Sequence, residues 1–146
     1  MRNPRLFAIP LVVIFAGLSA LHAYWALGGR WGSANTVPIV GGRRSFEPSP
    51  LATWVVCALL GIAVAVVAGK VAGIGPAVLR LFFDTGVWGL SLVFLVRAIG
   101  NLRTFGFFKT ITGTPFAQWD TWLYSPLCLL ISLLAARLAW LPRQRL

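Results

Sequence analysis

Apolar residues gather in four long runs along the chain, separated by polar segments that are rich in glycine, proline and basic residues. An α-helix rises about 1.5 Å per residue, so each run is long enough to cross a hydrocarbon core of roughly 30 Å. We therefore predict an all-α membrane protein with transmembrane helices at approximately 6–27, 51–71, 77–99 and 122–141.

The segments between these runs differ in length. Residues 28–50 and 100–121 are long, whereas Gly73, Ile74, Gly75 and Pro76 form a short turn. Short connections favour antiparallel neighbours. The pattern predicts an up-down-up-down four-helix bundle, with residues 1–146 as one integral membrane domain and both long interfacial loops on the same side.

Composition supports a membrane protein rather than a soluble one. Hydrophobic residues make up 58% of the chain and charged residues 11%, whereas soluble domains carry about 25% charged residues. Thirteen basic residues oppose three acidic ones, and most lie at the ends of apolar runs. This placement favours lipid headgroups as partners and argues against nucleic acid.

The basic residues also bear on orientation. Four spans place both termini on one side, and that side would hold seven of the thirteen basic residues: Arg2, Arg5, Lys70, Arg80, Arg137, Arg143 and Arg145. The loop side would hold the rest: Arg30, Arg43, Arg44, Arg97, Arg103 and Lys109. By the positive-inside rule, this narrow excess predicts cytoplasmic termini.

Two predicted helices carry small residues at every fourth position. These are Cys57, Gly61, Ala65 and Gly69 in the second span, and Cys128, Ser132 and Ala136 in the fourth. Small residues at this spacing let helices approach closely in lipid. We expect them to form helix–helix contacts, within the chain, in a homo-oligomer or in a larger membrane complex. Both cysteines are expected to be free, packed thiols.

The stretch from Arg97 to Ser125 is too polar to span a bilayer and too aromatic for a free linker. Amphipathic rings and long cations of this kind are typical of the membrane–water boundary. The predicted topology brings it to the same side as the end of the first helix, where a polar pocket including Trp122 would form. The candidate ligand-binding residues are His22, Tyr24, Trp25, Arg97, Asn101, Arg103, Lys109, Trp119 and Asp120.

Two ion pairs are predicted. Arg97 ends the third run and Asp120 precedes the fourth, so a bridge between them would join the two helices. Asp120 is alternatively a cap for the fourth helix. Arg80 and Asp84 are spaced for a pair on one helical face.

The sequence offers little for catalysis or metal binding. His22 is the sole histidine, and no cysteine or carboxylate stands at ligand spacing to it. No nucleophile–base pair is recognisable. We predict that the protein binds no metal and no cofactor. The sequence favours a non-enzymatic protein over an enzyme.

Two strings are distinctive: HAYWALGG at the end of the first run, and FAQWDTWLYSPLC at the start of the fourth. They resemble a family of small bacterial four-span integral membrane proteins of unknown function. The resemblance implies the same four-helix architecture and a location in the bacterial cytoplasmic (inner) membrane, and it implies no activity.

Three functions are compatible with these features. The chain could bind an anionic amphiphile, such as a lipid headgroup or quinone-like molecule, in the loop-side pocket. It could be an accessory subunit that packs through its small-residue faces. It could be an intramembrane enzyme, such as an isomerase that uses His22 and Asp120.

Overall fold

The computed structural model describes residues 3–73 and 75–142. It contains four helices that are long and apolar enough to cross a membrane, which confirms the predicted all-α fold with four spans. The first three lie within two residues of their predicted bounds: α1 Arg5–Ala26, α2 Pro50–Ala72 and α3 Ala77–Ile99. Some residues used in the predictions lie outside the described residues: Arg2, Arg143 and Arg145 from the count of basic residues, and Ile74 from the short turn.

The fourth span begins earlier than the apolar run predicts. It is a continuous helical segment of 26 residues, divided into α4 Pro115–Trp119, a π-helical turn Asp120–Tyr124, and α5 Ser125–Trp140. The Thr114 side chain accepts a hydrogen bond from the Ala117 N–H, and Pro115 occupies the first turn. These are ordinary helix-start signals. Thr114 caps the helix, so the alternative role of Asp120 as its cap is wrong.

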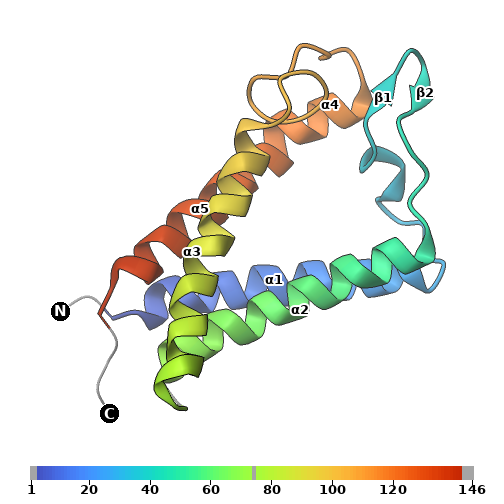
Figure 1. Ribbon diagram of the computed structural model, residues 1–146. Coiled ribbons are helices and arrows are strands. Elements are labelled where there is room, and N and C mark those ends of the chain that lie inside the picture. Colours follow the sequence, from blue (N-terminus) through green and yellow to red (C-terminus); the bar gives the residue numbers. More distant parts are fainter. Residues whose placement is uncertain (1–2, 74, 143–146) are drawn as a thin grey trace.

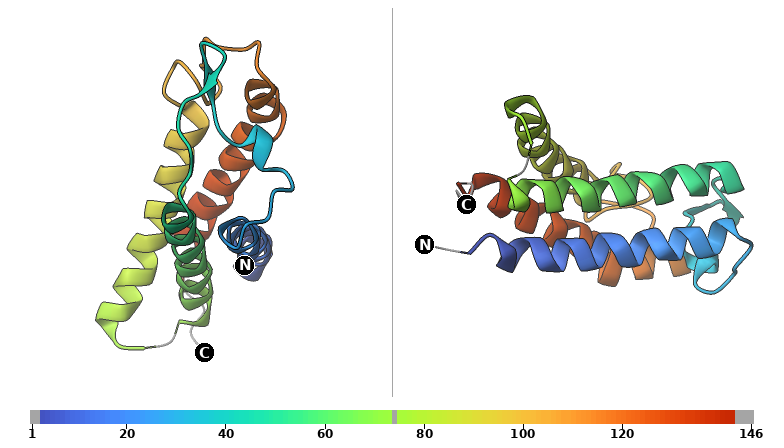
Figure 2. Two further views of the ribbon diagram at one scale, coloured as in Figure 1. Left: turned by 90° about the vertical axis from the view of Figure 1, so that its right-hand side faces the viewer. Right: turned by 90° about the horizontal axis from the view of Figure 1, so that it is seen from below.

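The helices form two antiparallel pairs, α1 with α2 and α3 with α5 (Figure 1). The start of α1 and the end of α5 lie at one end of the molecule, where the pairs meet, and the pairs diverge towards the loops (Figures 1 and 2). The shared core therefore lies near the chain ends; its fully buried members include Leu11, Phe15, Val67, Val87, Ile131 and Leu138.

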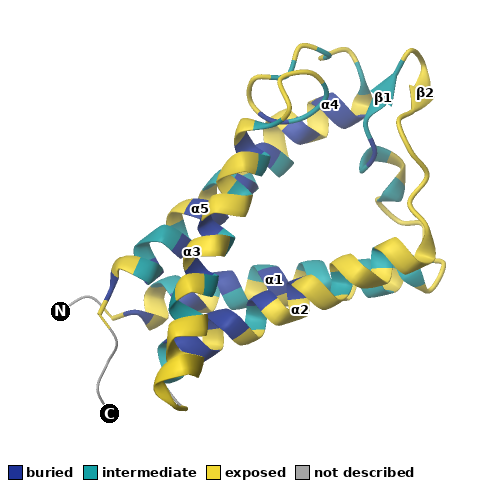
Figure 3. Cartoon of the chain, viewed as in Figure 1, coloured by how far each residue is buried: buried dark blue, intermediate teal, exposed yellow. Residues whose placement is uncertain are grey.

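Most apolar side chains face outward. Only 11% of the apolar window of α3 is buried inside the protein, and the exposed residues, yellow in Figure 3, are most extensive along α2 and α3. Outward apolar side chains are expected where lipid is the solvent.

The α2–α3 junction interlocks closely and fixes the two pairs relative to each other. A Cβ at Gly69 would lie 2.5 Å from the Phe83 ring, so only glycine admits that ring. The buried Lys70 ammonium lies 2.7 Å from the Asp84 carboxylate. Asp84 therefore has a partner on α2 that the prediction of a pair with Arg80 did not include.

The two small-residue faces have different surroundings. Ser132 of α5 is buried, and its carbonyl accepts a hydrogen bond of 3.0 Å from the Ser91 hydroxyl of α3, as a helix–helix contact requires. On α2, Gly61 and Ala65 are exposed, so these two residues do not make the expected helix–helix contact within the described chain, and a contact with another chain stays a prediction. Both cysteines are free, as predicted, with Cys128 buried and Cys57 half-buried.

The first loop has more structure than its glycines and prolines suggest. It contains a 3-10 turn η1, Ser33–Asn35, and a two-stranded hairpin in which β1 Ile39–Val40 pairs antiparallel with β2 Arg43–Arg44. A Gly-Gly pair makes the turn between the strands, which is a common two-residue hairpin connection. The hairpin carries Arg44 back towards the helix ends.

Candidate functional site

Asp120 lies at the start of the π-helical turn, and its side chain is completely buried. Pro126 stands shortly after this turn and has no N–H to donate to the α-helical ladder, which helps to explain why the helix widens here. The Ser125 N–H donates to the Asp120 carbonyl across the wide turn. This geometry also brings the Ser125 hydroxyl to the Asp120 carboxylate, at 3.1 Å.

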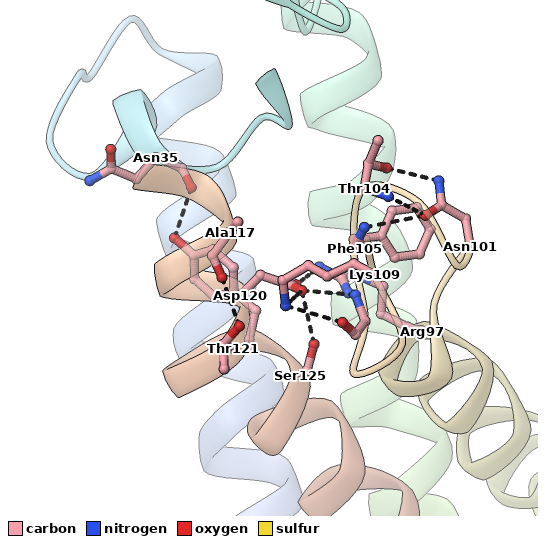
Figure 4. Close-up of polar contacts among 12 residues, drawn as sticks. Asn35, Arg97, Asn101, Thr104, Phe105, Lys109, Ala117, Asp120, Thr121 and Ser125 are labelled. Atoms are coloured by element: carbon pink, nitrogen blue, oxygen red, sulfur yellow. Dashed lines mark hydrogen bonds and ion pairs between the residues drawn. The ribbon is translucent and has the colours of Figure 1, made fainter. Parts of the chain in front are cut away.

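Four donors surround the Asp120 carboxylate (Figure 4). Arg97 donates to Oδ1 at 2.8 Å. Oδ2 accepts from the Gly106 N–H at 2.8 Å, the Lys109 ammonium at 3.1 Å and the Ser125 hydroxyl. The predicted Arg97–Asp120 ion pair is present, and Lys109 is a second cation on the same carboxylate.

The segment that carries Lys109 folds back onto the end of α3. The backbones of Gly100 and Gly106 touch, and each has a positive φ, +88° and +90°. A Cβ at Gly100 would collide with the Phe105 carbonyl, and a Cβ at Gly106 would collide with the Ile99 carbonyl. The Asn101 carboxamide oxygen accepts backbone N–H groups from Arg103, Thr104 and Phe105. We call Arg97, Gly106, Lys109, Asp120 and Ser125 the Asp120 cluster.

This cluster is closed around its carboxylate, whereas the Arg97 side chain is 32% exposed. The Lys109 side chain is 4% exposed, and the Arg97 guanidinium stacks over the Phe105 ring at 4.7 Å. Arg97 Nη1 is buried and has no hydrogen-bond partner among the described residues. A carboxylate saturated by four donors is a structural anchor rather than a base available to a substrate.

A separate cavity of about 670 Å³ lies between the ends of α1 and α2 and the first loop. Its polar lining includes His22, Arg30, Arg44 and Glu47, and its apolar lining includes Val37, Phe46, Ala52 and Val56. We call this space the loop cavity. Pockets of roughly 300–1,000 Å³ are typical of small-molecule sites.

The charges around the loop cavity leave a positive excess. Glu47 is 76% exposed and lies 3.2 Å from Arg44, which also donates to the Ser33 carbonyl at 3.3 Å. Arg30 has no ion-pair partner among the described residues. One guanidinium is therefore not neutralised by the protein.

Most hydroxyl groups that line the loop cavity are already used as donors. Ser33 donates to the Arg30 carbonyl, Thr36 to the Ser33 carbonyl and Thr53 to the Ser49 carbonyl. The Trp25 indole N–H donates to the Trp31 carbonyl at 2.8 Å. The cavity wall is thus held in shape by internal bonds.

His22 lies on α1 in the wall of the loop cavity. Its Nδ1 is 2.8 Å from the Leu18 carbonyl oxygen, and its ring makes an edge contact with Trp25 at 5.0 Å between centroids. Among the described residues, no group of His, Cys, Asp or Glu side chains is arranged to hold a metal ion.

The structure thus divides the predicted pocket between two places. His22 and Trp25 line the loop cavity, whereas Arg97, Lys109 and Asp120 form the Asp120 cluster. Asp120 is not among the residues that line the loop cavity, so the geometry does not favour an isomerase that uses His22 and Asp120 together.

The other candidates lie outside both places or support them. The Tyr24 ring covers Gly29, and Asn101 organises the turn after α3. Arg103, Trp119 and Trp122 are exposed at the loop end, as interfacial residues would be.

Sequence reasoning missed Arg30 and Arg44 as site residues. The usable signal was the Gly41–Gly42 pair between short runs of strand-forming character, which predicts a hairpin that returns Arg44 to the helix ends. A hydrogen bond of 3.4 Å from the Tyr124 hydroxyl to the Asn35 carbonyl also ties this loop to the π-helical turn (Figure 4).

Comparison with known proteins gives one family. The pattern that defines the family described as "Protein of unknown function (DUF3995)" matches residues 15–135. No curated protein and no solved structure matches the chain.

Proposed function

Because the chain belongs to the DUF3995 family of unknown function, we propose a role from its own geometry: it binds an anionic amphiphile in the loop cavity. The ligand is a lipid with a phosphate group. The single observation that carries this proposal is a cavity to which the loop contributes two arginines, Arg30 and Arg44, and to which the loop and the start of α2 both contribute apolar side chains.

The chemistry of these basic and apolar side chains matches the two parts of such a ligand. Arg30 and Arg44 would bind the phosphate, since guanidinium groups bond phosphate oxygens with favourable geometry. Val56 and Ala52 would contact the start of the apolar chain. A soluble anion would leave the apolar wall unused.

The Asp120 cluster has a supporting role in this proposal. It closes the end of the α3–α5 pair, and Tyr124 connects that pair to the loop that covers the cavity. Arg97 is not among the residues that line the cavity, so the phosphate is assigned to the two arginines that do. Arg30 has no ion-pair partner among the described residues, and the pair of Arg44 is with the exposed Glu47 carboxylate.

The multi-pass architecture sets the location of the protein in a membrane. We further propose the bacterial cytoplasmic membrane with both termini in the cytoplasm, supported by the seven-to-six distribution of basic residues and by the common end at which α1 begins and α5 finishes. A cytoplasm-active reporter fused after Leu146 should be active. Activity of a periplasm-only reporter at that position would reverse the orientation.

The test of binding uses the intact protein in detergent and an anionic phospholipid as the probe. Arg30→Gln with Arg44→Gln should weaken binding at least about tenfold, because charge-assisted hydrogen bonds to phosphate are lost. The matched control is Arg43→Gln with Arg103→Gln, which removes the same charge from exposed arginines that do not line the cavity.

Two outcomes would contradict the proposal. One is equal binding by both double variants, which would mean that net charge alone attracts the lipid. The other is displacement of the lipid by excess inorganic phosphate, which would mean that the site recognises a free anion rather than an amphiphile.

One observation favours a second candidate, an accessory subunit of a membrane complex. Gly61 and Ala65 are exposed on α2, so this small-residue face is free to meet another helix. Gly61→Leu should then abolish copurification of a partner and leave lipid binding unchanged. Copurification that persists in this variant would exclude the face as a contact.

A further inference from the structure

The unique histidine allows a narrower statement about the ligand of the loop cavity. We propose that the lipid carries a free hydroxyl group between its phosphate and its apolar chain, as a lysophospholipid does, and that His22 Nε2 accepts a hydrogen bond from this hydroxyl. This inference rests on the proposed function and adds the class of lipid.

The first step is the tautomer of His22. A carbonyl oxygen can only accept, so the contact of 2.8 Å between Nδ1 and the Leu18 carbonyl requires a proton on Nδ1. In the neutral ring Nε2 then carries a lone pair and is an acceptor. No hydrogen bond joins Nε2 to another group among the described residues.

The second step is the inventory of other polar groups in the wall. Arg30 and Arg44 offer only donors, and the hydroxyls of Ser33, Thr36 and Thr53 already donate to backbone carbonyls. The Ser49 hydroxyl accepts from the Ala52 N–H, and the Glu47 carboxylate pairs with Arg44. A phosphate satisfies the arginines. Nε2 remains available to accept, so a matching ligand has a donor as well as an anionic group.

The third step is relative depth. Arg30 and Arg44 belong to the loop, whereas His22 lies inside α1, four residues before its last residue, Ala26. By helical rise this is about 6 Å from the helix end. In a ligand whose phosphate binds at the loop and whose apolar chain lies along the helices, the glycerol carbons lie between the phosphate and the chain. These carbons would therefore lie next to His22. A free hydroxyl there distinguishes a lysophospholipid from a diacyl lipid.

The test compares two probes on the wild-type protein: oleoyl lysophosphatidic acid, and its analogue in which the free glycerol hydroxyl is methylated. Both probes keep the phosphate and the chain. The methylated probe should bind about three- to tenfold more weakly, the range expected for loss of one hydrogen bond. Equal binding would overturn the inference, whereas failure of both probes to bind would overturn the proposed function itself.

His22→Phe supplies the matched variant, because the phenyl ring can keep the edge contact with Trp25. It should lower the affinity for the hydroxyl-bearing probe to that of the methylated one and leave the methylated one unchanged. A preference that survives in His22→Phe would assign the hydroxyl to another group and contradict the proposal.

A spectroscopic readout tests the inference without a variant, so it holds even if His22→Phe does not fold. Nitrogen NMR of the wild-type histidine should show a protonated Nδ1 and an unprotonated Nε2, and the Nε2 signal should shift when the hydroxyl-bearing probe binds. A protonated Nε2 in the neutral ring, or no shift on binding, would contradict the assigned role.

Discussion

The Asp120 cluster and the loop cavity both gather charged side chains at the loop end of the molecule, but they satisfy those charges differently. In the cluster one buried carboxylate accepts four hydrogen bonds from the protein. Among the described residues, Arg30 in the cavity has no ion-pair partner and Nε2 of His22 has no hydrogen-bond partner. The buried carboxylate, whose oxygens accept hydrogen bonds from the protein itself, holds the fold together, whereas the polar groups that the protein leaves unpaired around the cavity are available to a ligand.

The largest expected effect tests the structural half of this contrast. Asp120→Leu leaves two cations, a backbone N–H and a hydroxyl without their acceptor, and it should lower the free energy of unfolding by about 3–5 kcal/mol. Thermal unfolding in detergent measures the loss. Arg97→Leu should cost less than Asp120→Leu, because Lys109 still pairs with the carboxylate.

A double variant sharpens the same test. Arg97→Leu with Asp120→Leu should cost less than the sum of the two single changes, because the partners interact directly. Additive losses would show that the two side chains are not energetically coupled and would remove the cluster from its structural role.

The next effect concerns the turn that delivers Lys109. Gly106→Ala would force a positive φ on a residue with a Cβ that meets the Ile99 carbonyl and the Gly100 backbone, at a cost of about 1–3 kcal/mol. Gly89→Ala is the control, since its Cβ would meet no atom within 4 Å. Similar melting temperatures for the two variants would mean that the turn does not set the stability of the cluster.

The smallest effect concerns a polar contact remote from both regions. Ser91→Ala removes the hydrogen bond to the Ser132 carbonyl between α3 and α5 and should cost about 1 kcal/mol. Lipid affinity should not change. A large change in affinity would show that packing of this helix pair controls the cavity, which the division between the two regions does not allow.

Much of the fold could be predicted because bilayer-length apolar runs leave few alternatives. The Arg97–Asp120 pair was also predictable, since three acidic residues serve thirteen basic ones and Asp120 follows Arg97 closely in the topology. The role of Lys109 was less accessible, because it depends on the fold-back that the Gly100–Gly106 contact permits.

The errors have identifiable causes. The start of the fourth span was predicted too late, because Asp120 and the aromatic residues near it suggested a segment at the membrane interface. The Thr114–Pro115 pair was the better signal for the start of this helix. Spacing identified a small-residue face on α2, but spacing does not tell which partner, lipid or helix, a face meets. The lining of the loop cavity was not predicted, because it is formed by segments that only the hairpin brings together.

The most direct test of the division between the two regions is photo-crosslinking with an anionic lysophospholipid that carries a diazirine beside its phosphate. Binding in the loop cavity predicts adducts within residues 22–56 that excess unlabelled lipid suppresses. Competed adducts concentrated within residues 97–125, around the Asp120 cluster, would contradict the assignment of the ligand to the cavity.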